Sequence, residues 1–171
     1  MKAITRKTIS AIAASGVIAG AVTFVGSEEG LRTKAYRDAV GKPTICYGET
    51  RGVSMGDEKA PEDCEHMLAT SLNAEVHKVD MLSHRHLPDE MRVALASFRY
   101  NVGPDAFARS TLLLRLASGD YEGACNEMPK WVYAGHGEHR RAVPGLIERR
   151  KAEQELCLIG ARKMKDGHSG G

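Results

Sequence analysis

The sequence predicts an α+β fold in which a small β-ribbon lobe faces a mainly helical lobe across a cleft. Residues 34–48 are interrupted by Asp38, Gly41 and Pro43, which is typical of a short ribbon with tight turns. Most of the chain beyond this ribbon carries apolar residues at helical spacing. A hydrophobic helix is expected ahead of both lobes, because residues 8–27 include no charged side chain.

The composition favours one folded domain that acts as a monomer. The chain has 171 residues, of which 42% are hydrophobic and 27% charged, and this is an ordinary globular balance. A net charge of +2 and few aromatic residues give little surface for binding nucleic acid, so no nucleic-acid partner is expected. Basic residues gather late in the chain, where we expect a solvated or polyanion-facing surface: Lys130, Arg140, Arg141, Arg149, Arg150 and Lys151.

The N-terminal segment is a candidate membrane segment. Lys2, Arg6 and Lys7 precede 20 uncharged residues, a length that just spans a bilayer. Only seven of these 20 residues are large and apolar, and the others are Ala, Gly, Ser or Thr, so insertion is predicted to be marginal. The basic flank predicts a cytoplasmic N-terminus, which places the rest of the chain outside the membrane.

Three fates are open for this segment. A cleaved signal peptide could use Ala19, Gly20 and Ala21 as its cleavage site, and the mature chain would then begin at Val22. A permanent anchor would normally contain more Leu and Ile. We favour a segment that the export machinery of the host inserts and that later leaves the bilayer.

Three helices are expected after the ribbon. The first begins at Pro61, since proline and acidic residues favour the first helical turn. A second covers residues 91–102 and stops before Gly103, and a third covers residues 111–118 with Ser110 as its N-cap. The first helix should bury the apolar residues that recur at helical spacing: Leu68, Leu72, Val76 and Val79.

The C-terminal part is expected to contain a short helix over residues 121–128, a turn over 131–135 and a last helix over 144–159. Residues 161–171 lack apolar periodicity and are expected to form a disordered tail. The chain is thereby divided into a membrane segment (1–27), a folded domain (28–160) and a tail (161–171).

The four cysteines predict disulfides, because an even number in an exported domain is typical of an oxidising compartment. Three connectivities are possible. We favour Cys46 with Cys64, joining the ribbon to the next helix, and Cys125 with Cys157, joining two C-terminal helices. Reduced, buried thiols are the alternative. No two cysteines have the C-x-x-C spacing of a zinc site, and neither a metal nor a cofactor is expected.

Two acidic residues form the candidate catalytic pair. Glu29 closes a helical run and Asp38 lies in the glycine-rich ribbon, six residues before Thr44. Cleavage of a glycosidic bond requires one protonated carboxyl group and one ionised group. An apolar wall at a helix end favours the protonated form, and a polar turn favours the ionised form. In a chain with 22 acidic residues, however, such a spacing also arises by chance on a solvated face.

The residues around this pair are more specific. The run EGLRTKAYRDAVGKPTICYG has a Glu followed after eight residues by an Asp and after five more by a Thr. It resembles the signature of the phage-type muramidases, glycoside hydrolase family 24. Weaker likeness continues at residues 98–103, 110–113 and 144–150, so the resemblance covers most of the predicted domain. It implies a lysozyme-like fold in which Glu29 is the general acid, Asp38 orients the attacking water and Thr44 helps to hold that water.

The resemblance also implies a function. The expected reaction is hydrolysis of the β-1,4 bond between N-acetylmuramic acid and N-acetylglucosamine in peptidoglycan, for lysis of the host cell. The N-terminal segment resembles the signal-anchor-release segment of some phage endolysins. A protein of that kind is tethered to the host inner membrane, inactive, with its domain in the periplasm, and becomes active and soluble on release. The alternatives are a lytic transglycosylase, which uses a single essential Glu, and a catalytically silent, membrane-tethered wall-binding protein.

Overall fold

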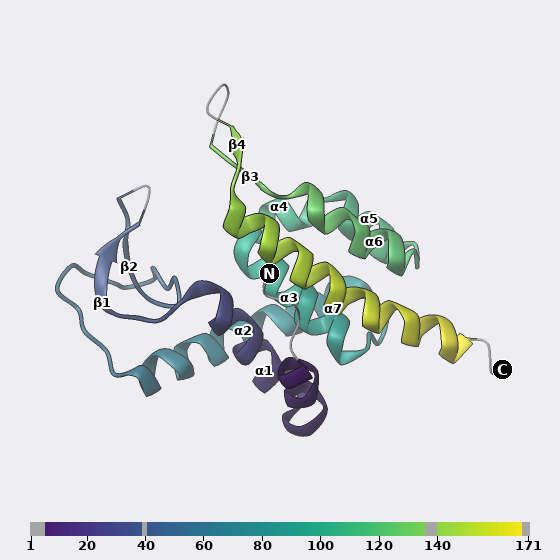
Figure 1. The fold of residues 1–171 in the computed structure, drawn as a ribbon, viewed down its shortest axis with the longest axis horizontal. Coiled ribbons are helices and arrows are strands. Elements are labelled where there is room, and N and C mark those ends of the chain that lie inside the picture. The colour runs from purple at the N-terminus through teal and green to yellow at the C-terminus, as the bar shows by residue number, and fades with distance from the viewer. Residues whose placement is uncertain (1–5, 39–40, 136–139, 169–171) are drawn as a thin grey trace.

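The computed structural model describes residues 6–38, 41–135 and 140–168, in which a small β-ribbon projects to one side of a set of packed helices (Figure 1). This arrangement confirms the predicted α+β fold. The elements in chain order are α1 (Arg6–Glu29), β1 (Arg32–Arg37), β2 (Pro43–Cys46), α2 (Pro61–Ser83), α3 (Asp89–Val102), α4 (Pro104–Ala108), α5 (Thr111–Ala117), α6 (Tyr121–Glu127), the 3-10 turn η1 (Met128–Lys130), β3 (Tyr133–Ala134), β4 (Arg141–Ala142) and α7 (Pro144–His168).

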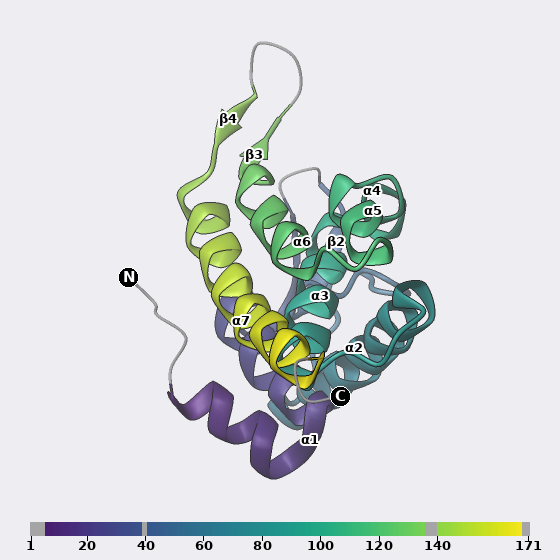
Figure 2. The ribbon, with the colours of Figure 1, turned by 90° about the vertical axis from the view of Figure 1, so that its right-hand side faces the viewer.

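Helix α3 is the centre of the helical lobe. It packs against α1, α2 and α7, and Figure 2 shows it between α2 and α7. A helix that is apolar around most of its circumference must be covered on most sides, which explains this position. The fully buried side chains of α3 include Val93, Ala94, Leu95, Ala96 and Phe98, and α2 adds the predicted Leu68, Leu72, Val76 and Val79.

The β-ribbon is antiparallel and has its own small core. Arg37 pairs with Pro43 and Tyr36 with Thr44, and the register becomes irregular toward Arg32. Ile45 of β2 is buried in a cluster separate from the main core of the helices. This small cluster includes Cys64 of α2, so it anchors the ribbon to the helical lobe.

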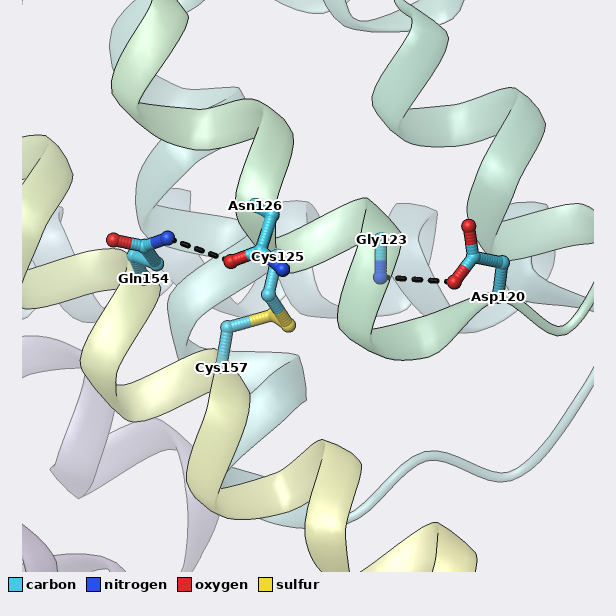
Figure 3. Close-up of a disulfide and its surroundings, with 6 residues drawn as sticks. All are labelled: Asp120, Gly123, Cys125, Asn126, Gln154 and Cys157. Atoms are coloured by element: carbon cyan, nitrogen blue, oxygen red, sulfur yellow. Dashed lines mark hydrogen bonds between the residues drawn. A yellow bond between two sulfur atoms is a disulfide. The ribbon is translucent and has the colours of Figure 1, made fainter.

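Two disulfides join the elements that the sequence analysis favoured. Cys46 at the end of β2 is bonded to Cys64 of α2, which ties the ribbon to the helical lobe. Cys125 of α6 is bonded to Cys157 of α7, beside a hydrogen bond from Gln154 to Asn126 (Figure 3). With sequence separations of 18 and 32 residues, each bond contributes about 3 to 4 kcal/mol if the unfolded loops behave as flexible chain.

Helix α1 is not the continuous helix that the uncharged run predicted. It is interrupted at Gly16, which has φ 81° and ψ 173°, and its two parts meet at an angle (Figure 2). Glycine permits this break because it has no Cβ to clash at positive φ. Beyond the break, Ala21, Phe24 and Val25 are buried in the main core. Among the helices of the described ranges, none combines the length and the apolar character needed to cross a membrane.

The C-terminal part departs from the prediction at two places. Where a turn was expected, β3 pairs with β4, matching Tyr133 with Ala142. The expected disorder of residues 161–171 is wrong for 161–168, because α7 continues to His168. Residues 169–171 lie outside the described residues.

The last turns of α7 are helical because they still contact the domain. Ala161 is buried, and Met164 packs against the core. Lys163 donates to Glu90 of α3 at 2.5 Å. Only a few anchoring residues are needed to hold these turns, so no apolar period is visible in the sequence.

Candidate active site

A cleft of about 820 Å³ separates the ribbon side of the molecule from the helices. It is lined by the last residue of α1, the turn after β2, one face of α2 and the C-terminal end of α3. The structure therefore has the cleft that the sequence predicted, with Glu29 at its edge.

Glu29 reaches the cleft because α1 ends there. Its side chain is 22% exposed. Gly48, in the turn after β2, adopts φ 92°, and a Cβ at this position would lie 3.8 Å from Oε2 of Glu29. The turn after β2 therefore lies directly beside the carboxylate of Glu29.

The carboxylate of Glu29 is paired with Arg149 of α7, whose Nη1 donates to its Oε1. Arg149 is 4% exposed, and its other nitrogens are also used. Nε donates to Glu153 at 3.0 Å, and Nη2 donates to the carbonyl oxygen of Ser97 at 3.3 Å. Glu29 therefore faces a fixed guanidinium group, not the apolar wall that the sequence analysis expected.

Arg150, the next residue, is fully buried and donates to Glu153 and to Asn101 of α3. The expected solvated surface of late basic residues is therefore wrong for Arg149 and Arg150. Both arginines lie three or four residues before Glu153 on the same helix, a spacing that predicts ion pairs but does not predict their burial.

The charges in this region act on their neighbours. Burial lowers the pKa of Arg149, but the carboxylates of Glu153 and Glu29 outweigh this and raise it above the usual value. Burial, followed by the charges of Glu29 and Glu49, raises the pKa of Tyr100 well above its ordinary value. Tyr100 therefore remains a hydroxyl donor, and it donates to the carbonyl oxygen of Tyr47 at 3.0 Å.

Asp38 and Thr44 lie together on the ribbon. The backbone N–H of Lys42 donates to Oδ1 of Asp38 at 2.8 Å, and the hydroxyl of Thr44 donates to the carbonyl oxygen of Lys42 at 3.0 Å. Asp38 is opposite Lys42, and Tyr36 is opposite Thr44, so all four side chains belong to one face of the ribbon. Thr44 is only 3% exposed.

The three predicted site residues thus form two groups. Asp38 and Thr44 come from the ribbon, while Glu29 comes from the helical lobe. Neither Asp38 nor Thr44 is among the described residues that line the cleft around Glu29.

Two further acidic residues in the cleft were not identified from the sequence. Glu49 accepts a hydrogen bond from the hydroxyl of Ser71 at 3.0 Å, and Glu75 is paired with Arg99. Nothing in the local sequence separates these residues from other surface acids. Within the described ranges, no three His, Cys, Asp or Glu side chains converge in a way that would hold a metal ion.

Comparison with known proteins finds similar sequences over most of the chain. Residues 26–153 match the phage lysozyme family. The SAR-endolysin of Bacteriophage PS119 is 35% identical over 162 residues, which cover 91% of this chain and 95% of that protein. The SAR-endolysin of Enterobacteria phage P21 is 34% identical, with 91% of this chain and 96% of that protein covered.

Solved structures agree with this relationship. The muramidase domain of SpmX from Asticaccaulis excentricus has a TM-score of 0.76 and is 33% identical, covering 81% of this chain and 94% of that chain. A mutant of P22 lysozyme has a TM-score of 0.69 and is 29% identical, covering 92% of this chain and 99% of that chain.

Proposed function

This chain is a member of the phage lysozyme family, a group of muramidase-type glycoside hydrolases, and from that premise we propose that it hydrolyses peptidoglycan for lysis of the host cell. The proposed bond is the β-1,4 bond between N-acetylmuramic acid and N-acetylglucosamine. The observation that carries this proposal is the position of Glu29 in a cleft large enough for sugar rings, with a second acid on the facing ribbon.

In the proposed mechanism, Glu29 in its protonated form donates a proton to the glycosidic oxygen as the bond to the anomeric carbon breaks. Asp38, as a carboxylate, accepts a proton from the water that attacks this carbon, and Thr44 helps to hold the water. The products are two shorter glycan chains, and Glu29 and Asp38 return to their starting forms by exchanging protons with solvent.

Release of dye from labelled peptidoglycan tests the hydrolase proposal against a silent wall-binding role. The purified parent protein should release soluble dye, whereas a variant with Glu29→Gln should bind the labelled sacculi without releasing dye. A parent protein that binds but releases nothing would identify a wall-binding protein.

We also propose that residues 1–27 tether the protein to the host inner membrane before lysis, with the domain in the periplasm, after insertion by the host export machinery. Several relatives are named SAR-endolysins. The structure adds a physical argument, because Phe24 and Val25 are buried in the main core. These side chains cannot lie in a bilayer and in the core at once, so tethering and assembly of the site should exclude each other.

The position of Glu29 supports the same conclusion. It lies only two residues after Ser27, where the uncharged run ends. At 1.5 Å per helical residue its backbone would sit about 3 Å beyond the end of that run. A glycan strand could not reach a cleft this close to the membrane, so the tethered form is proposed to be inactive.

Asp38→Asn is expected to reduce turnover by about 10²-fold or more, because an amide cannot accept the proton of the attacking water. Since Asp38 is proposed to act on water and not on the sugar, the product should have inverted anomeric configuration, with the two carboxyl groups about 6.5 to 9.5 Å apart. NMR of the fresh product gives the anomer. A retained anomer, or a fully active Asp38→Asn variant, would contradict this role.

A further inference from the structure

We propose that Glu153 is a positioning residue for the reaction: acting through Arg149, it fixes the direction of the Glu29 carboxyl group and offsets the positive charge beside it. This inference rests on the proposed function, in which Glu29 is the proton donor.

Glu153 lies on α7, and its side chain is fully buried. Its Oε1 accepts hydrogen bonds from the hydroxyl of Ser97 at 2.6 Å and from Nε of Arg149 at 3.0 Å. Its Oε2 accepts from Arg150. Both oxygens are therefore used, and the contacts join α7 to the central helix α3.

These contacts determine how Arg149 is oriented. A guanidinium group is planar, and its donors point in fixed directions. When Nε is held by Glu153 and Nη2 by the Ser97 carbonyl, Nη1 has one direction left, and Glu29 lies there. Glu29 is 120 residues away from Arg149 in the sequence, at the end of α1, and it reaches Arg149 only when α1 packs against the domain. Glu153 therefore orients Arg149 before the carboxylate of Glu29 binds to it.

The second part of the inference concerns charge. Arg149 and Arg150 carry two buried positive charges, and both pair with the carboxylate of Glu153. Burial raises the pKa of Glu153 above its ordinary value, and Arg150 and Arg149 offset part of this rise. The ionised form is favoured here because a neutral Glu153 would leave one buried guanidinium group without a counter-ion.

Loss of the charge on Glu153 would leave the carboxyl group of Glu29 beside two buried cations with no interior anion to offset them. The other titratable or charged side chains that line the cleft with Glu29 include Tyr100 on α3, Tyr47, Glu49 and Arg51 in the turn after β2, and His66 and Glu75 on α2. A substitution at Glu153 leaves all of them in place.

Glu153→Gln tests this inference in the full-length, folded protein on labelled peptidoglycan. We expect kcat to fall by about 10- to 100-fold with KM within about twofold of the parent, because substrate contacts are unchanged while the proton donor is misplaced. The pH at which kcat/KM falls on the alkaline side should move lower by about one unit. A role limited to stability would not move this pH.

Glu90→Gln is the matched control. Like Glu153, Glu90 carries a buried carboxylate that takes part in an ion pair. Glu90 lies on α3 and pairs with Lys163 of α7, and this pair does not include Glu29. The control should lose stability and keep the parental pH profile. Parental kcat and pH profile in folded Glu153→Gln would overturn the inference, as would an equal shift in Glu90→Gln.

Removal of one partner from a buried ion pair is strongly destabilising, so a second, less destabilising variant is needed beside Glu153→Gln. Ser97→Ala removes the hydroxyl that donates to Glu153 and accepts from Nη2 of Arg149 at 3.3 Å, and it leaves both arginines and the Ser97 carbonyl oxygen in place. Lower kcat with unchanged KM supports the inference even if Glu153→Gln does not fold, and parental kcat in Ser97→Ala then overturns it. Failure of the proposed function would look different, because Glu29→Gln itself would remain active.

Discussion

Glu29→Gln is expected to lower kcat for peptidoglycan hydrolysis by about 10²- to 10⁴-fold while the protein remains folded. Glutamine has nearly the same shape as glutamate, but its amide cannot donate a proton to the leaving oxygen as a carboxylic acid does. Arg149 keeps Glu153 as a buried counter-ion in this variant, so no guanidinium group in the interior loses all of its partners. The initial rate of dye release measures the loss, and thermal unfolding shows whether the fold is intact.

Glu28→Gln is the control for this experiment. It makes the same chemical change one residue earlier, at a position that does not line the described cleft. We expect its activity to stay within about twofold of the parent, as for most surface substitutions. If Glu29→Gln retained more than about a tenth of the parental rate, Glu29 would not be the general acid.

Gly16→Leu is expected to keep the protein in the membrane and to delay lysis. The folded domain requires a break at Gly16 with positive φ, whereas a tethered segment requires a straight helix. A Cβ at Gly16 would meet no atom within 4 Å, so the effect would come from the backbone and the membrane, not from a clash.

Three contributions favour the tethered form of Gly16→Leu. Leucine at φ 81° and ψ 173° costs about 1 to 3 kcal/mol in the folded form. In a straight helix it is about 0.8 kcal/mol better than glycine, and it adds about 0.5 kcal/mol to insertion. The sum of about 2 to 4 kcal/mol corresponds to a shift on the order of 30- to 10³-fold toward the tethered form.

Membrane fractionation during expression, together with the time of lysis, measures this shift. Gly16→Asn is the matched control, because it carries the same backbone strain at φ 81° and ψ 173° but weakens insertion, so it should release earlier than Gly16→Leu. Lysis of Gly16→Leu on the parental schedule would contradict the release mechanism. A soluble parent protein that begins at Val22 would point to ordinary signal-peptide cleavage.

Local patterns account for what the sequence predicted correctly. The ribbon follows from turn residues close together in the chain, and the core face of α2 follows from helical spacing. The two disulfides follow from the order of the elements that they join. The fold class and the position of Glu29 at the end of a helix could therefore be predicted.

Contacts between distant residues account for what was missed. Arg149 was placed on a solvated surface because nothing near it in the sequence indicates that α1 docks beside it. The break at Gly16 also depends on tertiary packing, since the following residues turn into the core. The helical end of α7 is held by contacts that include the ion pair of Lys163 with Glu90 and the packing of Ala161 and Met164, and these leave no periodic pattern.

The central claim is that this protein hydrolyses one glycosidic bond of peptidoglycan with water as the second reactant, using Glu29 as the acid. Mass spectrometry of the products formed in water enriched with heavy oxygen tests this claim most directly. The Glu29→Gln variant is the negative control. The account predicts muropeptides that end in reducing N-acetylmuramic acid and carry one heavy oxygen atom at the new end. Anhydro-muramic ends without heavy oxygen would show a lytic transglycosylase, and reducing N-acetylglucosamine ends would show that a different bond is cut.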